Sequence, residues 1–178
     1  MFEVMNRIDN QLRVRHKALY VKKGMTGNVV KKFNDAYNSI AKKQGKPRFT
    51  LKEFQQIVAE ENEDVGDKEC PLDYEVFIEV MKKINRREYK RFIDDIKEYV
   101  DKGIPCVWSV TLGIVKEKDM PQMRGGHQRL IIGYNIDKTL IYYSDSWGSG
   151  HEKKSMSWDE AWTITMALNV YIQLEEKR

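Results

Sequence analysis

The stretch "RGGHQRLIIGYNIDKTLIYYSDSWGSGHE" (residues 124–152) contains two runs rich in β-branched and aromatic residues, separated by "NIDKT" (135–139). Such runs flanking a short polar turn predict two antiparallel strands joined as a hairpin. His127 stands at the start of the first strand and Asp145 at the exit of the second. The hairpin would therefore bring the two side chains close together at its open end, opposite the turn.

The two halves of the chain have different patterns. Residues 1–102 read mainly as helices, and residues 103–178 add two further strand-like runs, "IPCVWSVTLGIV" and "ALNVYIQLE". A short helix is expected at "SWDEAWTITM", just before the last strand. The pattern predicts one α+β domain over residues 1–178, with N-terminal helices followed by an antiparallel β-sheet of about four strands.

Local signals bound the expected helices. "GNVVKKFNDAYNSIAKKQG" places apolar residues at helical spacing and ends at Gly45, and Gly103 ends the last helix of the first half. Thr50 with Glu53, and Ser157 with Glu160, have the spacing of capping boxes. The apolar side of the helix expected over residues 27–45 is formed by Val29, Val30, Phe33, Ala36, Tyr37 and Ile40.

Composition narrows the function classes. The formal charge is +4, with 31 basic and 27 acidic residues interleaved along 178 residues, so no nucleic-acid partner is expected. No apolar run has the length of a membrane span and no signal peptide is visible, which predicts a cytoplasmic protein as written, or a secreted or membrane-associated one if an N-terminal segment is missing. Three separated histidines and two cysteines suggest neither a metal site nor a disulfide framework, and no cofactor is expected.

His127 and Asp145 permit two interpretations. They could simply cap strand ends. Alternatively, the carboxylate could hold one imidazole nitrogen, fix the tautomer and leave the other nitrogen as a base. Gly126, next to His127, would allow close approach of a ligand.

The segments "GIPCVWSV", "GGHQRLIIGYN", "YYSDSWGSGHE" and "SWDEAWTIT" resemble papain-like cysteine peptidases. They are most similar to the bacterial bacteriocin-processing-like group, whose members cleave after double-glycine leaders. The resemblance is strong over residues 103–168 and faint before them. It implies a papain-like fold, a peptide or protein substrate, His127 as catalytic base, Asp145 as its orienting partner and Trp147 as a shield against water.

The family also needs a nucleophilic cysteine at a helix N-terminus. Cys70 lies in the acidic stretch "GDKECPLD", where carboxylates raise a thiol pKa, and Cys106 lies inside an expected strand, where a cysteine is usually part of the core. We therefore expect neither to serve. "RVRHKALYVKKG" is similar to the family's second helix and "FEVMNRI" to the end of its first, which implies a nucleophile upstream of Met1 or lost.

These observations lead to two functional hypotheses and leave the substrate and oligomeric state open. The first is a cysteine-peptidase-like domain that is inactive as written. The alternative is a non-catalytic peptide-binding module. Among the remaining residues, Trp108 is expected in the core or lining a substrate groove, Trp158 and Trp162 in the core, His151 in a structural or surface turn, and His16 on a solvated helix face.

Overall fold

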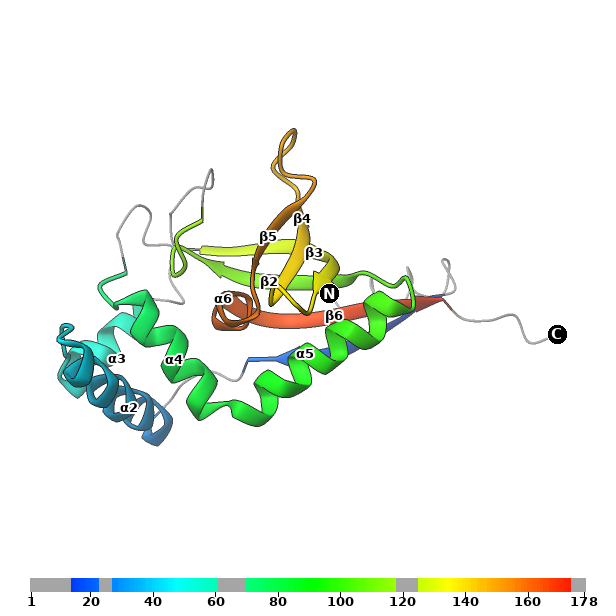
Figure 1. Ribbon diagram of the computed structural model, residues 1–178. Helices are drawn as coiled ribbons and strands as arrows, with labels where there is room; N and C mark the ends of the chain where they lie inside the picture. The colour runs from blue at the N-terminus through cyan, green and yellow to red at the C-terminus, as the bar shows by residue number, and fades with distance from the viewer. Residues whose placement is uncertain (1–13, 23–26, 61–69, 118–124, 174–178) are drawn as a thin grey trace.

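The computed structural model of this chain describes residues 14–22, 27–60, 70–117 and 125–173. The chain has an α+β fold, as its sequence predicts (Figure 1). The segment "FEVMNRI" (residues 2–8) and residues 61–69, which include the first half of "GDKECPLD", fall outside the described ranges. The elements, in chain order, are β1 (Val14–Val21), α2 (Asn28–Gln44), α3 (Leu51–Glu60), α4 (Tyr74–Ile84), α5 (Arg86–Asp101), β2 (Cys106–Leu112), β3 (Gly125–Asn135), β4 (Leu140–Asp145), β5 (Lys154–Ser157), α6 (Trp158–Ile164) and β6 (Thr165–Gln173).

Within the described residues, six strands form one sheet in the order β1-β6-β2-β3-β4-β5, and every neighbouring pair is antiparallel. The hairpin between β3 and β4 is present, and the Asn135 side chain accepts a hydrogen bond of 2.8 Å from the backbone N–H of Lys138 in its turn. β1 and β5 add two strands to the four that the sequence suggested. This order places β3 near the middle of the sheet, between β2 and β4.

The prediction that residues 14–21 belong to the helical part is wrong. They form β1, which pairs with β6 from Val14↔Gln173 to Val21↔Ala167. Pairing satisfies the backbone groups of both strands, and this long-range gain overrides the local helical pattern. His16 is consequently on a strand and not on a helix face, and its Nε2 lies 3.1 Å from Oδ1 of Asn169. The similarity of this segment to a second helix of the family fails with it.

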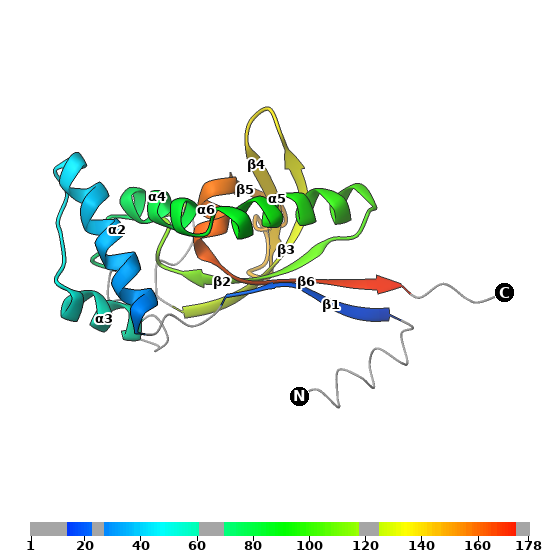
Figure 2. The same cartoon turned by 90° about the horizontal axis from the view of Figure 1, so that it is seen from below.

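Helices α4, α5 and α6 lie on one side of the sheet (Figure 2). α5 packs against β1, β2 and β3, and α6 against β2 and β4, while α4 contacts α5 and α6 and carries α2. Figure 2 shows α4, α5 and α6 along one side of the strands β1, β6 and β2, with α2 and α3 at one end. β2 alternates between buried and half-buried residues from Cys106 to Val110, as expected for a sheet with one covered face.

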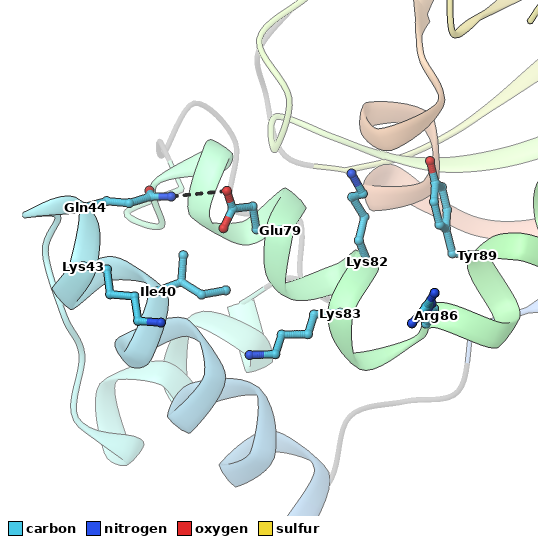
Figure 3. A pocket seen from close by; sticks show the side chains of 8 residues that line it. All are labelled: Ile40, Lys43, Gln44, Glu79, Lys82, Lys83, Arg86 and Tyr89. Carbon is cyan, nitrogen blue, oxygen red and sulfur yellow. Dashed lines mark hydrogen bonds between the residues drawn. The ribbon is translucent and has the colours of Figure 1, made fainter.

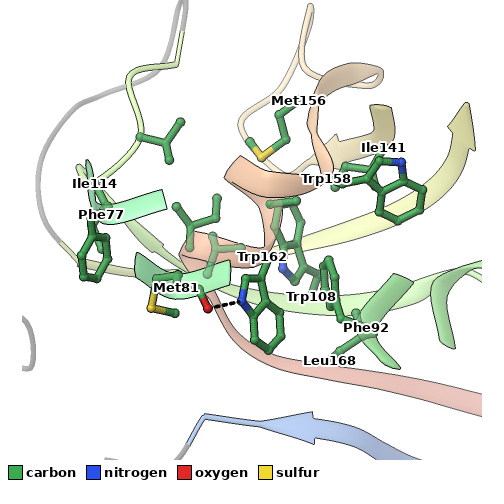
Figure 4. Packing of buried hydrophobic residues seen from close by; sticks show 14 of the residues in the cluster. Phe77, Met81, Phe92, Trp108, Ile114, Ile141, Met156, Trp158, Trp162 and Leu168 are labelled. Carbon is green, nitrogen blue, oxygen red and sulfur yellow. Dashed lines mark hydrogen bonds between the residues drawn. The ribbon is translucent and has the colours of Figure 1, made fainter. Parts of the chain in front are cut away.

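Trp162 of α6 lies at the centre of the interface between the helices and the sheet. Its side chain is fully buried, its ring lies 4.9 Å from Tyr20 and 5.4 Å from Phe92, and its Nε1–H donates to the Met81 carbonyl. Figure 4 shows Trp162 among Met81, Phe92 and Leu168. Trp158 is also buried, so the core prediction for both tryptophans is confirmed.

Trp108 belongs to the same core. Its side chain is 0% exposed and its Nε1–H donates to the Thr165 hydroxyl at 2.8 Å. A fully enclosed indole cannot line an open groove, so the substrate-groove alternative for Trp108 is wrong. Val29, expected on the apolar face of α2, is 46% exposed, whereas Val30 is buried.

The local capping signals are confirmed. Thr50 and Glu53 exchange hydrogen bonds between side chain and backbone at the start of α3, and Ser157 and Glu160 form a complete capping box on α6. Gly45, in the left-handed conformation, ends α2. The capping box therefore fixes the first turn of α6, and β6 follows α6 without an intervening loop.

Replacing Trp162 by Ala should lower the free energy of unfolding by about 3–5 kcal/mol, because the large cavity left between α4, α5 and the sheet cannot collapse. Urea denaturation followed by circular dichroism measures this loss. Val29→Ala, on the exposed side of α2, is the matched control and should stay within about 0.5 kcal/mol of the parent. Equal effects of the two changes would contradict the assigned packing.

Candidate active site

The sheet register brings His127 and Asp145 together. His127 is opposite Val110 of β2, and two residues further along β3, Arg129 is opposite Asp145 of β4. Residues two apart on a strand share a face, so the three polar side chains lie on one side of the sheet. Nε2 of His127 is 2.7 Å from Oδ1 of Asp145. The predicted proximity of these two residues is therefore present in the structure.

This hydrogen bond fixes the state of the neutral imidazole. A carboxylate oxygen only accepts, so Nε2 must carry the proton and Nδ1 keeps its lone pair. The His127 side chain is 16% exposed and that of Asp145 is 0% exposed. Nδ1 is therefore the ring nitrogen that can act as a base.

Trp147 lies beside Nδ1 of His127. Its ring meets the imidazole edge-on, with centroids 5.1 Å apart and planes at 74°. Its Nε1–H points to Nδ1 of His127 over 3.4 Å, a long hydrogen bond. The neighbouring turn is tied to the same strand end, since the backbone N–H of Asp145 donates to the carbonyl of His151 at 2.9 Å. His151 thus contributes to the turn.

A buried ion network, which the sequence reasoning missed, lies behind the pair. Nε of Arg129 donates to Oδ2 of Asp145 at 2.8 Å, and its Nη2 donates to Oε1 of Glu117 at 3.0 Å. Nη1 of Arg129 is also 3.0 Å from Oε2 of Glu117. The side chain of Arg129 is 0% exposed and that of Glu117 is 10% exposed. One guanidinium therefore joins two carboxylates away from water.

Aromatic rings enclose this network. The Arg129 guanidinium carbon lies 4.7 Å from the centroid of the Tyr143 ring and 5.7 Å from that of Trp108. The Tyr143 hydroxyl donates to Oε2 of Glu117 at 2.6 Å. Burial and this hydrogen bond to a carboxylate both raise the pKa of Tyr143, so the hydroxyl stays a neutral donor.

The period of two along β3 could have revealed Arg129, because a residue two places after His127 must share its face. No comparable signal exists for Glu117, which lies in the connection after β2. At Gly126, a Cβ would meet nothing within 4 Å, so the packing does not require a glycine. The role of Gly126 in admitting a ligand stays a prediction.

A separate cavity of about 740 Å³ lies among α2, α4 and α5, and Figure 3 shows its lining side chains, which do not include the His127–Asp145 pair. Lys43 is in the last turn of α2, and Lys82 and Lys83 are in that of α4. Positive side chains there stabilise the exposed helix carbonyls, and Lys82 also pairs with Asp159 at 2.6 Å. The positions of these three lysines are therefore explained by their roles in the structure.

The described ranges contain no cluster of three His, Cys, Asp or Glu side chains that could hold a metal ion. In the same ranges no helix combines the length and apolar character needed to cross a bilayer.

The model of one known family covers nearly the whole chain, since it matches residues 14–176. The chain belongs to the Peptidase_C39 like family. Membership confirms the resemblance to C39-type, papain-like cysteine peptidases and makes this a cysteine-peptidase-like domain. No curated protein and no solved structure matches the chain.

Asp145→Asn should reverse the tautomer of His127. Arg129 needs an acceptor, so the new amide oxygen would face Arg129 and the amide nitrogen would face the imidazole and donate to Nε2. The proton of neutral His127 would then move to Nδ1. Nitrogen-15 NMR of histidine-labelled protein separates the two tautomers. His16, which contacts neither residue, is the internal control, and a proton that remains on Nε2 would contradict the geometry.

Proposed function

We propose that His127 and Asp145 are the base and the orienting carboxylate of a cysteine-peptidase site that takes a peptide or protein substrate. The observation that carries the proposal is the 2.7 Å hydrogen bond between Nε2 and Oδ1, with the other imidazole nitrogen left as an acceptor. Membership of the Peptidase_C39 like family supports the same chemistry. Trp147, in edge contact with the ring, would limit access of water to the pair.

The chemistry would follow from this arrangement. Nδ1 of His127 would take the proton from a thiol, and the thiolate would attack the peptide carbonyl. The resulting imidazolium would be stabilised by the Asp145 carboxylate and would return its proton to the leaving amine. Water, activated by the same nitrogen, would then hydrolyse the thioester. Asp145 would stay ionised throughout and act by fixing the ring and its charge.

Neither cysteine of the sequence suits the role of nucleophile. Cys106 is opposite Ile131, four residues from the position facing His127 on β2, which is roughly 13 Å along a strand. Its side chain is fully buried, and burial, with a smaller contribution from the charge of Asp95, raises its pKa to about 12. Cys70 precedes α4, which packs against α2, α5 and α6.

We therefore propose that the 178-residue chain does not hydrolyse peptides by itself. Removing the nucleophile from such a site costs about as much rate as removing the whole triad. The hypothesis of a nucleophile upstream of Met1 stays a proposal, and it has lost the support of the helix similarity, because residues 14–21 form a strand. A non-catalytic peptide-binding module is the alternative.

Thiol labelling tests the assignment of the cysteines. At pH 8 an alkylating reagent should label Cys70 in the folded protein and leave Cys106 unmodified, because the buried thiol ionises only near pH 12. Mass spectrometry of the digested protein gives the two extents. Labelling in denaturant, where both thiols should react fully, is the control. Rapid modification of Cys106 in the folded protein would contradict its exclusion.

Peptide hydrolysis tests the function. The chain as written should show no turnover of a peptide library, and a version extended by an upstream cysteine-bearing segment should show turnover that His127→Ala abolishes. His16→Ala is the matched control and should leave that turnover unchanged. Hydrolysis by the original chain that survives the combined changes Cys70→Ala and Cys106→Ala and stops with His127→Ala would overturn the need for a thiol. Peptide binding without hydrolysis in both versions would favour the binding module.

A further inference from the structure

We propose that Arg129 and Glu117 are positioning residues for the His127–Asp145 pair: Arg129 fixes the carboxylate, and Glu117 offsets the charge that Arg129 would otherwise impose on it. The inference rests on the proposed function of the pair and names two residues that the function itself does not assign. It concerns the orientation and charge of the pair and involves no bond-making step.

Arg129 fixes the direction in which Asp145 points. The two carboxylate oxygens are used separately, Oδ1 by His127 at 2.7 Å and Oδ2 by Arg129 at 2.8 Å. The backbone of Asp145 is also tied, through its N–H, to His151. A carboxylate held at both oxygens and at its backbone cannot rotate without breaking a charge-assisted hydrogen bond. The imidazole is thereby held with Nδ1 turned toward Trp147.

Without Glu117, the positive charge of Arg129 would weaken the hydrogen bond between His127 and Asp145. A guanidinium 2.8 Å from Oδ2 neutralises much of the charge that Asp145 presents to His127. Glu117 returns a negative charge to the group, since its carboxylate oxygens lie 3.0 Å from Nη1 and Nη2. With Asp145 and Glu117 ionised and Arg129 positive, the three side chains carry a net charge of −1. That charge strengthens the hydrogen bond that Asp145 accepts from Nε2 of His127.

The remaining groups around the pair do not replace Glu117. Tyr143, from β4, is a neutral donor to Oε2 of Glu117 at 2.6 Å. Trp147, from the loop after β4, contributes no charge. The ring of His151 lies 6.4 Å from that of Trp147, centroid to centroid, and the backbone carbonyl of His151 accepts from the N–H of Asp145. The connection after β2 thus supplies the second carboxylate, while β3 and β4 supply the other members.

Histidine NMR of the intact chain tests the charge role, because it needs no substrate and no nucleophile. Glu117→Gln keeps the size of the side chain and an oxygen for Arg129 but removes the negative charge. The Nε2–H proton signal of His127 should then move upfield, because Arg129 is left to draw more of the charge of Asp145 and the hydrogen bond from Nε2 to Oδ1 weakens. Glu152→Gln, which neutralises an exposed carboxylate in the turn after β4, is the matched control and should move that signal by less than a third as much.

Arg129→Lys tests the positioning role. Lysine keeps the charge but lacks the planar fork that reaches Asp145 and Glu117 together. The Nε2–H signal of His127 should broaden or exchange faster with water, while the circular dichroism spectrum stays that of the parent. An unchanged His127 signal in this variant, or the same Nε2–H shift in Glu117→Gln and the parent, would overturn the proposal. Should Asp145→Asn leave the His127 tautomer unaltered, the pair itself would be refuted, and with it the proposed function.

Discussion

The alternation of side chains along β3 is the constraint on which the site depends. β3 lies between β2 and β4, so its register is fixed on both sides. His127, Arg129 and Ile131 consequently share one face, and Asp145 joins them from β4. A shift of one residue in the pairing of β3 with β4 would place Asp145 on the opposite face from His127 and Arg129. The site is therefore a consequence of sheet register more than of any single contact.

Burial of the Arg129 charge is the costly part of this arrangement. Removing an ion from water costs several kcal/mol, and replacing a buried ion pair by apolar residues is often neutral or stabilising. Stability alone therefore gives little reason to hold a guanidinium between two carboxylates. Geometry gives a better one, because only a planar fork can hold Asp145 on one side and Glu117 on the other. The free-energy cost of burying Arg129 is explained if the site requires a fixed direction of the Asp145 carboxylate.

The sequence predicted features whose signals are local. The β3–β4 hairpin, the capping boxes at Thr50 and Ser157 and the proximity of His127 to Asp145 all follow from spacing within about twenty residues. β1 was missed because its strand conformation depends on β6, about 150 residues away. Glu117 was missed for a different reason. Its partner Arg129 is close in sequence, but no periodic pattern connects an irregular segment to a strand.

The geometry also specifies how a nucleophile would have to approach. Asp145 occupies Nε2, so only Nδ1 of His127 can accept a proton, and the indole of Trp147 already stands 3.4 Å from that nitrogen. A thiol would have to enter beside Trp147 or displace it. Cys106 cannot do so, because it lies further along β2, inside the core between the sheet and its helices. A thiol, a bound peptide or both would thus meet the imidazole at the start of β3 and the end of β4, beside Gly126 and Trp147.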